Sequence, residues 1–273
     1  MIELGDITAL KPFYSLHRRF KEWQHRRNEK NWDAERRRPQ NRFRHILDVA
    51  NEIAQRNPRG VPDLLRAVLR PLQSEYLVGV AELGRDPFVT MTPSELWGRF
   101  VGTKLWTAQG DIRGTCEDPQ QYPVHLCRDV VLPWPWRVES FISTLATVGS
   151  SKIDPAAPAY LRHDRRKWTQ DYHNHRVDVW LPWGIAFVSG GNHSICAGIL
   201  VGEGVIIPNT VMDMGFLLNE VHCDGKNFIE TGTEKILGPV TDPRTAAAFE
   251  LGRLIRSADM PPTGGEWARR NEI

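Results

Sequence analysis

Residues 190–194, which read Gly-Gly-Asn-His-Ser, are the strongest candidates for a chemical role in this chain. An apolar run precedes them and small apolar residues follow, so the pattern predicts a strand, a tight turn and a helix. Backbone N–H groups converge in such a turn, and a helix N-terminus carries partial positive charge, which together favour a bound anion. The candidate phosphate site therefore consists of Gly190, Gly191, Asn192, His193 and Ser194. The alternative is an ordinary turn whose glycines only supply positive φ.

Three polar residues of this turn suit a phosphate in different ways. Asn192 is a favourable N-cap residue, and His193 can donate a hydrogen bond from its ring. The Ser194 hydroxyl can contact a phosphate oxygen or a hydrated metal ion. The turn thus favours a phosphate-bearing ligand.

A second candidate site is rich in histidine and aspartate. His163, Asp164, Asp171, His173 and His175 fall within thirteen positions. If the last part of this stretch is a strand, Asp171, His173 and His175 point to one face, where alternating ligands of these types could bind Zn, Mn or Fe. The alternative is a polar loop with surface histidines, because no fourth ligand is identifiable from the sequence.

Positive charge is concentrated near the N-terminus. Residues 17–44 hold eleven Lys or Arg against four Asp or Glu, whereas the rest of the chain holds 24 against 29. This basic segment favours contact with nucleic acid such as DNA, through Arg18, Arg19, Arg26, Arg27, Arg36, Arg37 and Arg38. The alternative is a solvated helix face, since the apolar residues Phe13, Leu16, Phe20 and Trp23 recur at helical spacing opposite the arginines.

The composition is that of a globular protein. Of 273 residues, 41% are hydrophobic and 25% are charged, which excludes a disordered, collagen-like or low-complexity chain. No apolar run approaches the roughly 18 residues of a membrane span. The four cysteines, at positions 116, 127, 196 and 223, form no CxxC pair, which favours reduced thiols over a disulfide framework. We therefore expect a soluble cytoplasmic protein with no membrane partner.

Three regions must position these candidates. Residues 1–110 are expected to form a helical, basic N-terminal region, residues 125–240 a small mixed-sheet α/β domain, and residues 241–273 a C-terminal helix and a polar tail. The expected fold class is therefore α/β, in the α+β sense.

Local patterns set the boundaries of several elements. Thr92-Pro93-Ser94-Glu95 and Asp242-Pro243 are typical helix starts, and Asp224-Gly225 indicates a hairpin. Pro71 predicts a break or kink between the apolar runs 64–69 and 72–80. Periodicity predicts helices over residues 43–57, 138–148 and 194–201, a strand at 130–132, two strands within 177–188, and strands at 205–208 and 210–212.

The segment from residue 187 to residue 213 resembles the core motif of the ParB/sulfiredoxin superfamily. There an apolar strand leads into Gly-Gly-Cys-His-Arg in sulfiredoxins, or Gly-Glu-x-Arg in ParB proteins, followed by a small-residue helix and an apolar strand ending near Asp. The matching turn here is residues 190–194, and the second strand is residues 205–213. The resemblance covers about a tenth of the chain. It implies a bacterial protein in which Gly190, Gly191 and His193 lie at the phosphate tail of a nucleotide.

Two departures from the motif limit the activity that the resemblance implies. Asn192 stands at the position of the nucleophilic cysteine of sulfiredoxins, and an amide cannot attack a sulfinyl phosphate, so sulfinic acid reduction is not expected. Ser194 stands where both relatives carry Arg, so an Arg from elsewhere, such as residues 162–176, would have to hold the phosphate. Cys196, one helical turn after Asn192, is expected to be a buried small residue.

The sequence thus favours a nucleotide-binding protein. The expected ligand is a nucleoside triphosphate with Mg²⁺ at residues 190–194, with hydrolysis left open and no haem, flavin or iron–sulfur cluster. The first alternative is a metal-dependent protein that binds or cleaves DNA, with the metal on the His/Asp cluster and the phosphates on the basic segment. The second is a non-catalytic assembly protein with a purely structural glycine turn. The base, the physiological partner and the oligomeric state stay open.

Overall fold

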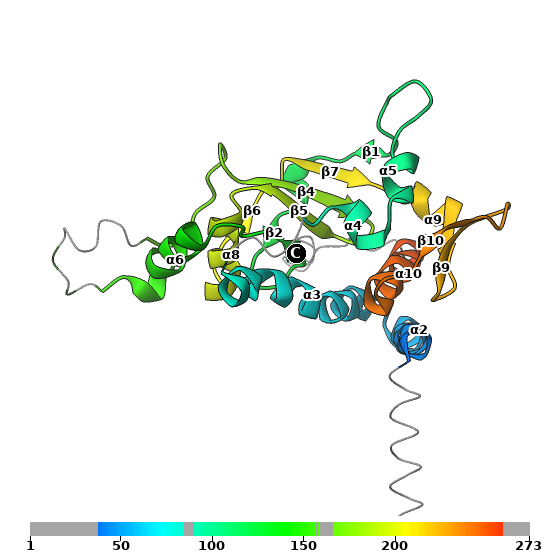
Figure 1. Ribbon diagram of the computed structural model, residues 1–273, viewed down its shortest axis with the longest axis horizontal. Helices are drawn as coiled ribbons and strands as arrows, with labels where there is room; N and C mark the ends of the chain where they lie inside the picture. Colours follow the sequence, from blue (N-terminus) through cyan, green and yellow to red (C-terminus); the bar gives the residue numbers. More distant parts are fainter. Residues whose placement is uncertain (1–37, 85–89, 155, 157, 159–165, 259–273) are drawn as a thin grey trace, which may run out of the picture.

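The computed structural model describes residues 38–84, 90–154, 156, 158 and 166–258, which form an α+β fold (Figure 1). The expected fold class, helices first, then a mixed sheet and a final helix, is confirmed. Several expectations concern residues outside this description: the arginines at positions 18, 19, 26, 27, 36 and 37, the pair at 163 and 164, and the polar tail after residue 258. Arg38 is described and directly precedes the first described helix.

The described N-terminal part is helical. Thr92 caps a helix as expected, because its Oγ1 accepts a hydrogen bond from the Glu95 N–H at 3.2 Å. That helix is short, since Gly98, with a φ of 120°, ends it. The elements are α2 (Pro39–Arg56), the 3-10 turn η2 (Pro58–Gly60), α3 (Val61–Leu83), α4 (Pro93–Trp97) and α5 (Phe100–Lys104).

Helix α3 continues through Pro71, where the sequence predicts a break or kink. A proline inside a helix removes one backbone hydrogen bond, so other contacts have to hold the helix together. The residues that follow and precede Pro71 supply them: Gln73 Nε2 donates to the Val131 carbonyl at 2.7 Å, and Arg70 Nη2 donates to the Arg128 carbonyl at 3.2 Å. Tertiary contacts therefore outweigh the local cost of the proline.

A five-stranded mixed sheet forms the centre of the fold. Its strand order is β1-β7-β4-β5-β3, with β3 parallel to β5 and β4 parallel to β7, while the other two pairs are antiparallel. Because β3 and β5 run in the same direction, the loops that follow them leave the sheet at one edge. The strands are β1 (Thr115–Cys116), β3 (Val131–Leu132), β4 (Arg176–Leu181), β5 (Ile185–Gly190) and β7 (Thr210–Asp213).

Two smaller sheets and further helices complete the described fold. The hairpin expected at Asp224-Gly225 is confirmed, since β8 and β9 pair antiparallel across it and Gly225 has a φ of 87°. Strand β10 extends this hairpin and has no counterpart in the sequence expectations. The remaining elements are β2 (Val124–His125), β6 (Val205–Ile206), β8 (Val221–Cys223), β9 (Asn227–Glu230), β10 (Ile236–Pro239), η3 (Pro119–Gln121), η4 (Ser150–Lys152), α6 (Val138–Thr147), α8 (Asn192–Val201), α9 (Phe216–Glu220) and α10 (Pro243–Ser257).

The central strands β4 and β5 are largely buried on both faces of the five-stranded sheet. On one face, Trp180 and Phe187 belong to a core that also contains Leu69 of α3 and Phe249 of α10. On the other face, Val179 packs in a second core with Ile195 of α8. Figure 1 shows α3 and α10 on the same side of the sheet. Residues of the N-terminal helices, the sheet and the C-terminal helix therefore share one core.

No helix in the described stretches is long and apolar enough to cross a membrane. All four cysteines are free, with Cys116 and Cys127 exposed. Cys196 and Cys223 are buried, and burial raises the pKa of each thiol to about 12. The expected burial of Cys196 is thus what the structure shows, and its thiol is held protonated.

Candidate functional site

The predicted strand, turn and helix around residues 190–194 are present. β5 ends at Gly190, Gly191 adopts a left-handed conformation with a φ of 72°, and α8 begins at Asn192. Gly191, and not Asn192, is the N-cap residue, so no side chain caps α8. Within the described part of the chain, the N-cap residue therefore supplies no side-chain acceptor to the backbone N–H groups of the first turn of α8.

The Asn192 and His193 side chains bind the loop of residues 133–137, which follows β3. Asn192 Oδ1 accepts a hydrogen bond from the Trp134 N–H at 2.7 Å. His193 Nε2 accepts one from the Arg137 N–H at 3.0 Å, and burial lowers the pKa of this imidazole. Since an acceptor nitrogen carries no proton, the neutral His193 ring is protonated at Nδ1. Both side chains thus fasten a neighbouring loop to the turn.

Ser194 is held by His175 from the segment that precedes β4. His175 Nδ1 accepts a hydrogen bond from the Asp171 N–H at 3.0 Å, so its proton lies on Nε2, which is 3.0 Å from Ser194 Oγ. The His175 ring also stacks on Trp168, with centroids 5.1 Å apart. Burial lowers the pKa of His175, which is 2% exposed. In this tautomer His175 donates to Ser194 and cannot act as its general base.

The space beside the two glycines is occupied by this chain itself. A Cβ atom on Gly190 would lie 2.6 Å from the Asn174 carbonyl oxygen, and one on Gly191 would overlap the His175 ring. The glycines therefore permit the close approach of residues 174–176. Gly191 has positive φ, as in the alternative that the sequence leaves open, whereas Gly190 does not.

The candidate metal ligands Asp171, His173 and His175 lie on a turn that precedes β4, and β4 itself begins at Arg176. The alternation expected on a strand therefore does not apply to them. Asp171 Oδ1 accepts a hydrogen bond from the His173 N–H at 3.0 Å, while both ring nitrogens of His175 are engaged as described above. Among the described residues, no three His, Cys, Asp or Glu side chains are grouped so that they could hold a metal ion.

The tryptophans near the turn are mainly core residues. Trp168, Trp180 and Trp183 are buried, and Trp134 is half-buried. Trp136 differs, since 46% of its surface is exposed and its ring lies edge-on to His193, with centroids 5.7 Å apart. The surface beside the start of α8 therefore presents an indole and the exposed Arg137.

A cavity of about 340 Å³ joins the end of the basic segment to the C-terminal helix. Arg42 of α2 and Arg244 of α10 both line it, and none of the described lining residues is acidic. Neither guanidinium has a hydrogen bond or an ion pair within the described part of the chain. The lining residues are Arg42, His45, Ile46, Ala67, Val68, Pro71 and Arg244.

Sequence reasoning missed this cavity. It identified the basic segment that contains Arg42, but Arg244 is distant in the chain and belongs to a helix whose start offered only a capping pattern. No spacing rule connects two residues so far apart, so only the packing of α10 against α2 and α3 reveals the pair.

Comparison with known proteins identifies the family. The model of DUF6710, a family of unknown function, matches residues 20–261, so this chain belongs to that family. No curated protein and no solved structure matches the chain.

Proposed function

Since membership of DUF6710 assigns no activity, we propose from the geometry that this protein binds nucleic acid through the phosphate backbone. The observation that carries the proposal is that Arg42 and Arg244 line one cavity whose described lining residues include no carboxylate. Guanidinium groups form bidentate hydrogen bonds with phosphate oxygens, so the pair is suited to a phosphate.

The electrostatics of the cavity favour an anion. Two guanidinium groups without a counter-charge repel each other, and a phosphate between them removes that repulsion. Arg244 also lies in the first turn of α10, where the helix dipole disfavours a cation. The Asp242 side chain caps this helix by accepting from the Arg244 N–H at 2.6 Å, but it forms no ion pair with the Arg244 guanidinium.

A polymer fits this arrangement better than a free phosphate. Arg42 lies within the basic segment of residues 17–44, which holds eleven Lys or Arg. A nucleic acid can contact the cavity and other parts of this segment together, whereas an isolated phosphate contacts the cavity alone. The proposal includes a cytoplasmic location, which rests on the unpaired cysteines.

The experiment is a titration of duplex and single-stranded DNA at several salt concentrations. The variant carries Arg42→Gln and Arg244→Gln together. The control is Arg56→Gln, on the same helix as Arg42, because Arg56 is exposed and already paired with Glu52 at 3.2 Å. We expect weaker binding for the double variant on every sequence, and a log–log salt slope flatter by roughly 0.7–0.9 for each phosphate that the variant no longer binds.

Two results would overturn this proposal. One is a wild-type protein that binds no nucleic acid at low salt. The other is a folded double variant with the affinity and salt slope of the Arg56→Gln control.

A nucleoside triphosphate with Mg²⁺ at residues 190–194 is the second candidate function. It is favoured by the start of α8, which has no side-chain cap and lies beside the exposed Trp136 indole. In this arrangement the phosphates accept from the first-turn N–H groups, Arg137 supplies positive charge, and the base stacks on Trp136. Hydrolysis, metal-dependent DNA cleavage and a purely structural role in an assembly are the further alternatives that the sequence left open.

Thermal-shift measurements with ATP, CTP, GTP and UTP, with and without Mg²⁺, test this second candidate. Specific binding raises the melting temperature as the nucleotide concentration rises. We expect Trp136→Ala and Arg137→Gln to reduce the shift, and Trp106→Ala, another exposed tryptophan, to leave it unchanged. The absence of a shift with all four nucleotides would exclude this site as a nucleotide site.

A further inference from the structure

A second cavity, of about 370 Å³, lies at the carboxyl end of β7, apart from both sites described above. β4 and β7 are parallel, so their carboxyl ends, at Leu181 and Asp213, meet at one edge of the sheet. Ligands of open α/β sheets commonly bind outside this end of the strands. The lining residues are Arg113, Gly114, Thr115, Asp213, Phe216 and Arg256.

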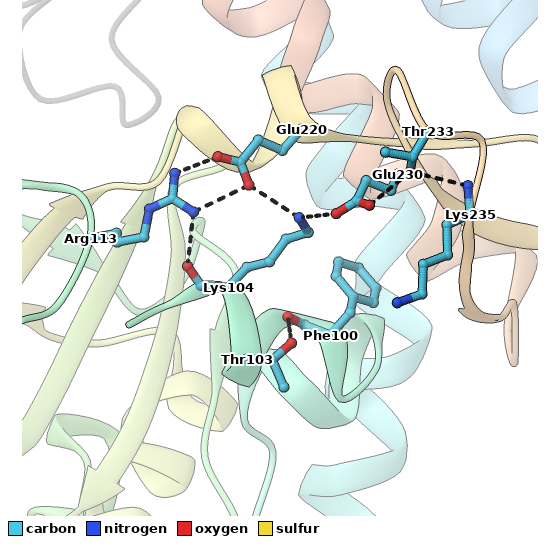
Figure 2. Close-up of polar contacts among 8 residues, drawn as sticks. All are labelled: Phe100, Thr103, Lys104, Arg113, Glu220, Glu230, Thr233 and Lys235. Atoms are coloured by element: carbon cyan, nitrogen blue, oxygen red, sulfur yellow. Dashed lines mark hydrogen bonds and ion pairs between the residues drawn. The ribbon is translucent and has the colours of Figure 1, made fainter. Parts of the chain in front are cut away.

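One wall of the cavity is fixed by a network of charged residues, shown in Figure 2. The Arg113 guanidinium donates to both carboxylate oxygens of Glu220, one of them at 3.2 Å. Lys104 Nζ in turn lies 3.2 Å from Glu220 and 2.9 Å from Glu230. Hydrogen bonds from Arg113 and Lys104 lower the pKa values of Glu220 and Glu230, respectively. The two cations and two carboxylates balance, so the positive charge of Arg113 is already compensated.

The Arg113 guanidinium also covers one side of the cavity wall, because it lies 4.2 Å from the centroid of the Phe216 ring. Phe216 is half-buried and belongs to the partly buried residues packed on the larger core. The wall formed by these two side chains is therefore partly apolar.

The other two charges of the cavity, on Arg256 and Asp213, are not compensated. Arg256 Nη1 donates to the Gly215 carbonyl and lies 3.5 Å from Asn219 Oδ1, and both acceptors are neutral. Asp213 Oδ1 accepts from the Gly215 N–H at 2.7 Å. In the described part of the chain neither residue has an ion-pair partner, and they do not pair with each other. The cavity thus presents one guanidinium and one carboxylate that each lack a counter-charge.

We propose that this cavity binds a small zwitterion of the α-amino acid class. The ligand carboxylate would bind Arg256, whose Nε–H and Nη2–H donors are not used within the described part of the protein, and the protonated amine would bind Asp213 Oδ2. A purely anionic ligand would lie near the Asp213 carboxylate, which has the same sign of charge. A purely cationic ligand would in the same way lie near the Arg256 guanidinium. A zwitterion satisfies both charges, and the volume of the cavity suits a small ligand.

The test measures binding of the twenty L-amino acids to the full-length protein by thermal shift, followed by calorimetry on those that raise the melting temperature. Acetate and methylamine, each carrying one of the two charges, are the ligand controls. We expect saturable binding of at least one amino acid and no comparable effect of either control. If no amino acid binds, or if acetate binds as tightly as the best amino acid, the proposal is wrong.

Two substitutions assign the binding to this cavity. Asp213→Asn keeps the oxygen that accepts from Gly215, and Arg256→Gln removes the unpaired charge; each is expected to weaken amino acid binding at least about tenfold. Arg244→Gln, in the proposed nucleic-acid cavity, is the matched control and should leave amino acid binding unchanged. Asp213→Asn should likewise leave DNA binding unchanged, which keeps the two proposals distinguishable. Full amino acid affinity in both folded cavity variants would contradict the proposal.

Discussion

At the scale of single residues, the side chains at the start of α8 connect three segments of the chain. Asn192 and His193 bind the loop after β3, and Ser194 binds the segment before β4 through His175. His175 is neutral in this arrangement, since its Nδ1 accepts a backbone N–H and burial lowers its pKa. Its protonation would break the hydrogen bond from Asp171.

This gives a prediction for the pH dependence of stability. A histidine whose pKa is lower in the folded state binds more protons when unfolded, so its contribution to stability is present above the unfolded pKa of about 6.5 and is lost as the pH falls through it. The free energy of unfolding, measured by urea titration, should therefore decrease between pH 7 and pH 5. His175→Asn, which retains an acceptor for the Asp171 N–H, should show a shallower decrease than wild type. An equally steep decrease in this variant would contradict the assignment.

Gly191 gives a second prediction at this scale. The His175 ring occupies the position where a Cβ would lie, and Gly191 has positive φ, so Gly191→Ala should destabilise the fold whether or not a ligand is present. We expect a loss of about 1–3 kcal/mol in the free energy of unfolding. Gly232→Ala is a suitable control, because Gly232 also has positive φ but no atom lies within 4 Å of its added Cβ. If Gly191→Ala and Gly232→Ala lose the same free energy of unfolding, the close approach of the His175 ring does not contribute to the effect.

At the scale of elements, the contact between α3 and β3 holds the helix across Pro71. Gln73 is 1% exposed and donates to the Val131 carbonyl, so Gln73→Leu should leave that buried carbonyl without its partner and cost about 1–3 kcal/mol. The neighbouring Ser74→Ala is the control, because the Ser74 hydroxyl is exposed and bonds only within its own helix. Chemical denaturation of both variants measures the difference. A Gln73→Leu protein as stable as Ser74→Ala would show that the contact does not stabilise α3.

At the scale of the whole molecule, one aromatic core joins the N-terminal helices, the sheet and α10. Trp183 is 1% exposed, and its Nε1 donates to the Phe249 carbonyl at 3.0 Å. Its ring centroid lies 4.5 Å from that of Trp97 in α4. Truncation of the Trp183 side chain should therefore destabilise the N-terminal helices, the sheet and α10 together.

We predict that Trp183→Ala lowers the free energy of unfolding by about 3–5 kcal/mol, as expected for a large buried aromatic. Far-UV circular dichroism and tryptophan fluorescence should report the same lowered transition, because the parts share one core. Trp106→Ala, at a position 53% exposed, should change stability by no more than about 0.5 kcal/mol. Two separate transitions in the Trp183 variant would mean that the regions unfold independently.

The local elements could be read from the sequence because their causes are local. The Thr92 cap of α4, the Asp242 cap of α10 and the Asp224-Gly225 hairpin depend on neighbouring residues, and all three are present. The turn between β5 and α8 was recognised in the same way, from two glycines between an apolar strand and a helix. The fold class followed from the order of these elements.

Two features depend on the tertiary structure: the surroundings of the turn between β5 and α8, and the places where charged side chains without an ion-pair partner line a cavity. The glycines at 190 and 191 suggest a turn from the sequence alone, and only the fold shows that residues 174–176 pack against the positions where Cβ atoms on these glycines would lie. Arg42 and Arg244 line one cavity, and Asp213 and Arg256 line the other. The two members of each pair are too far apart in the chain for a local sequence pattern to connect them. Sequence spacing therefore determined several local elements of this protein, and the packing of α10 and the sheet decided which of its charges share a cavity.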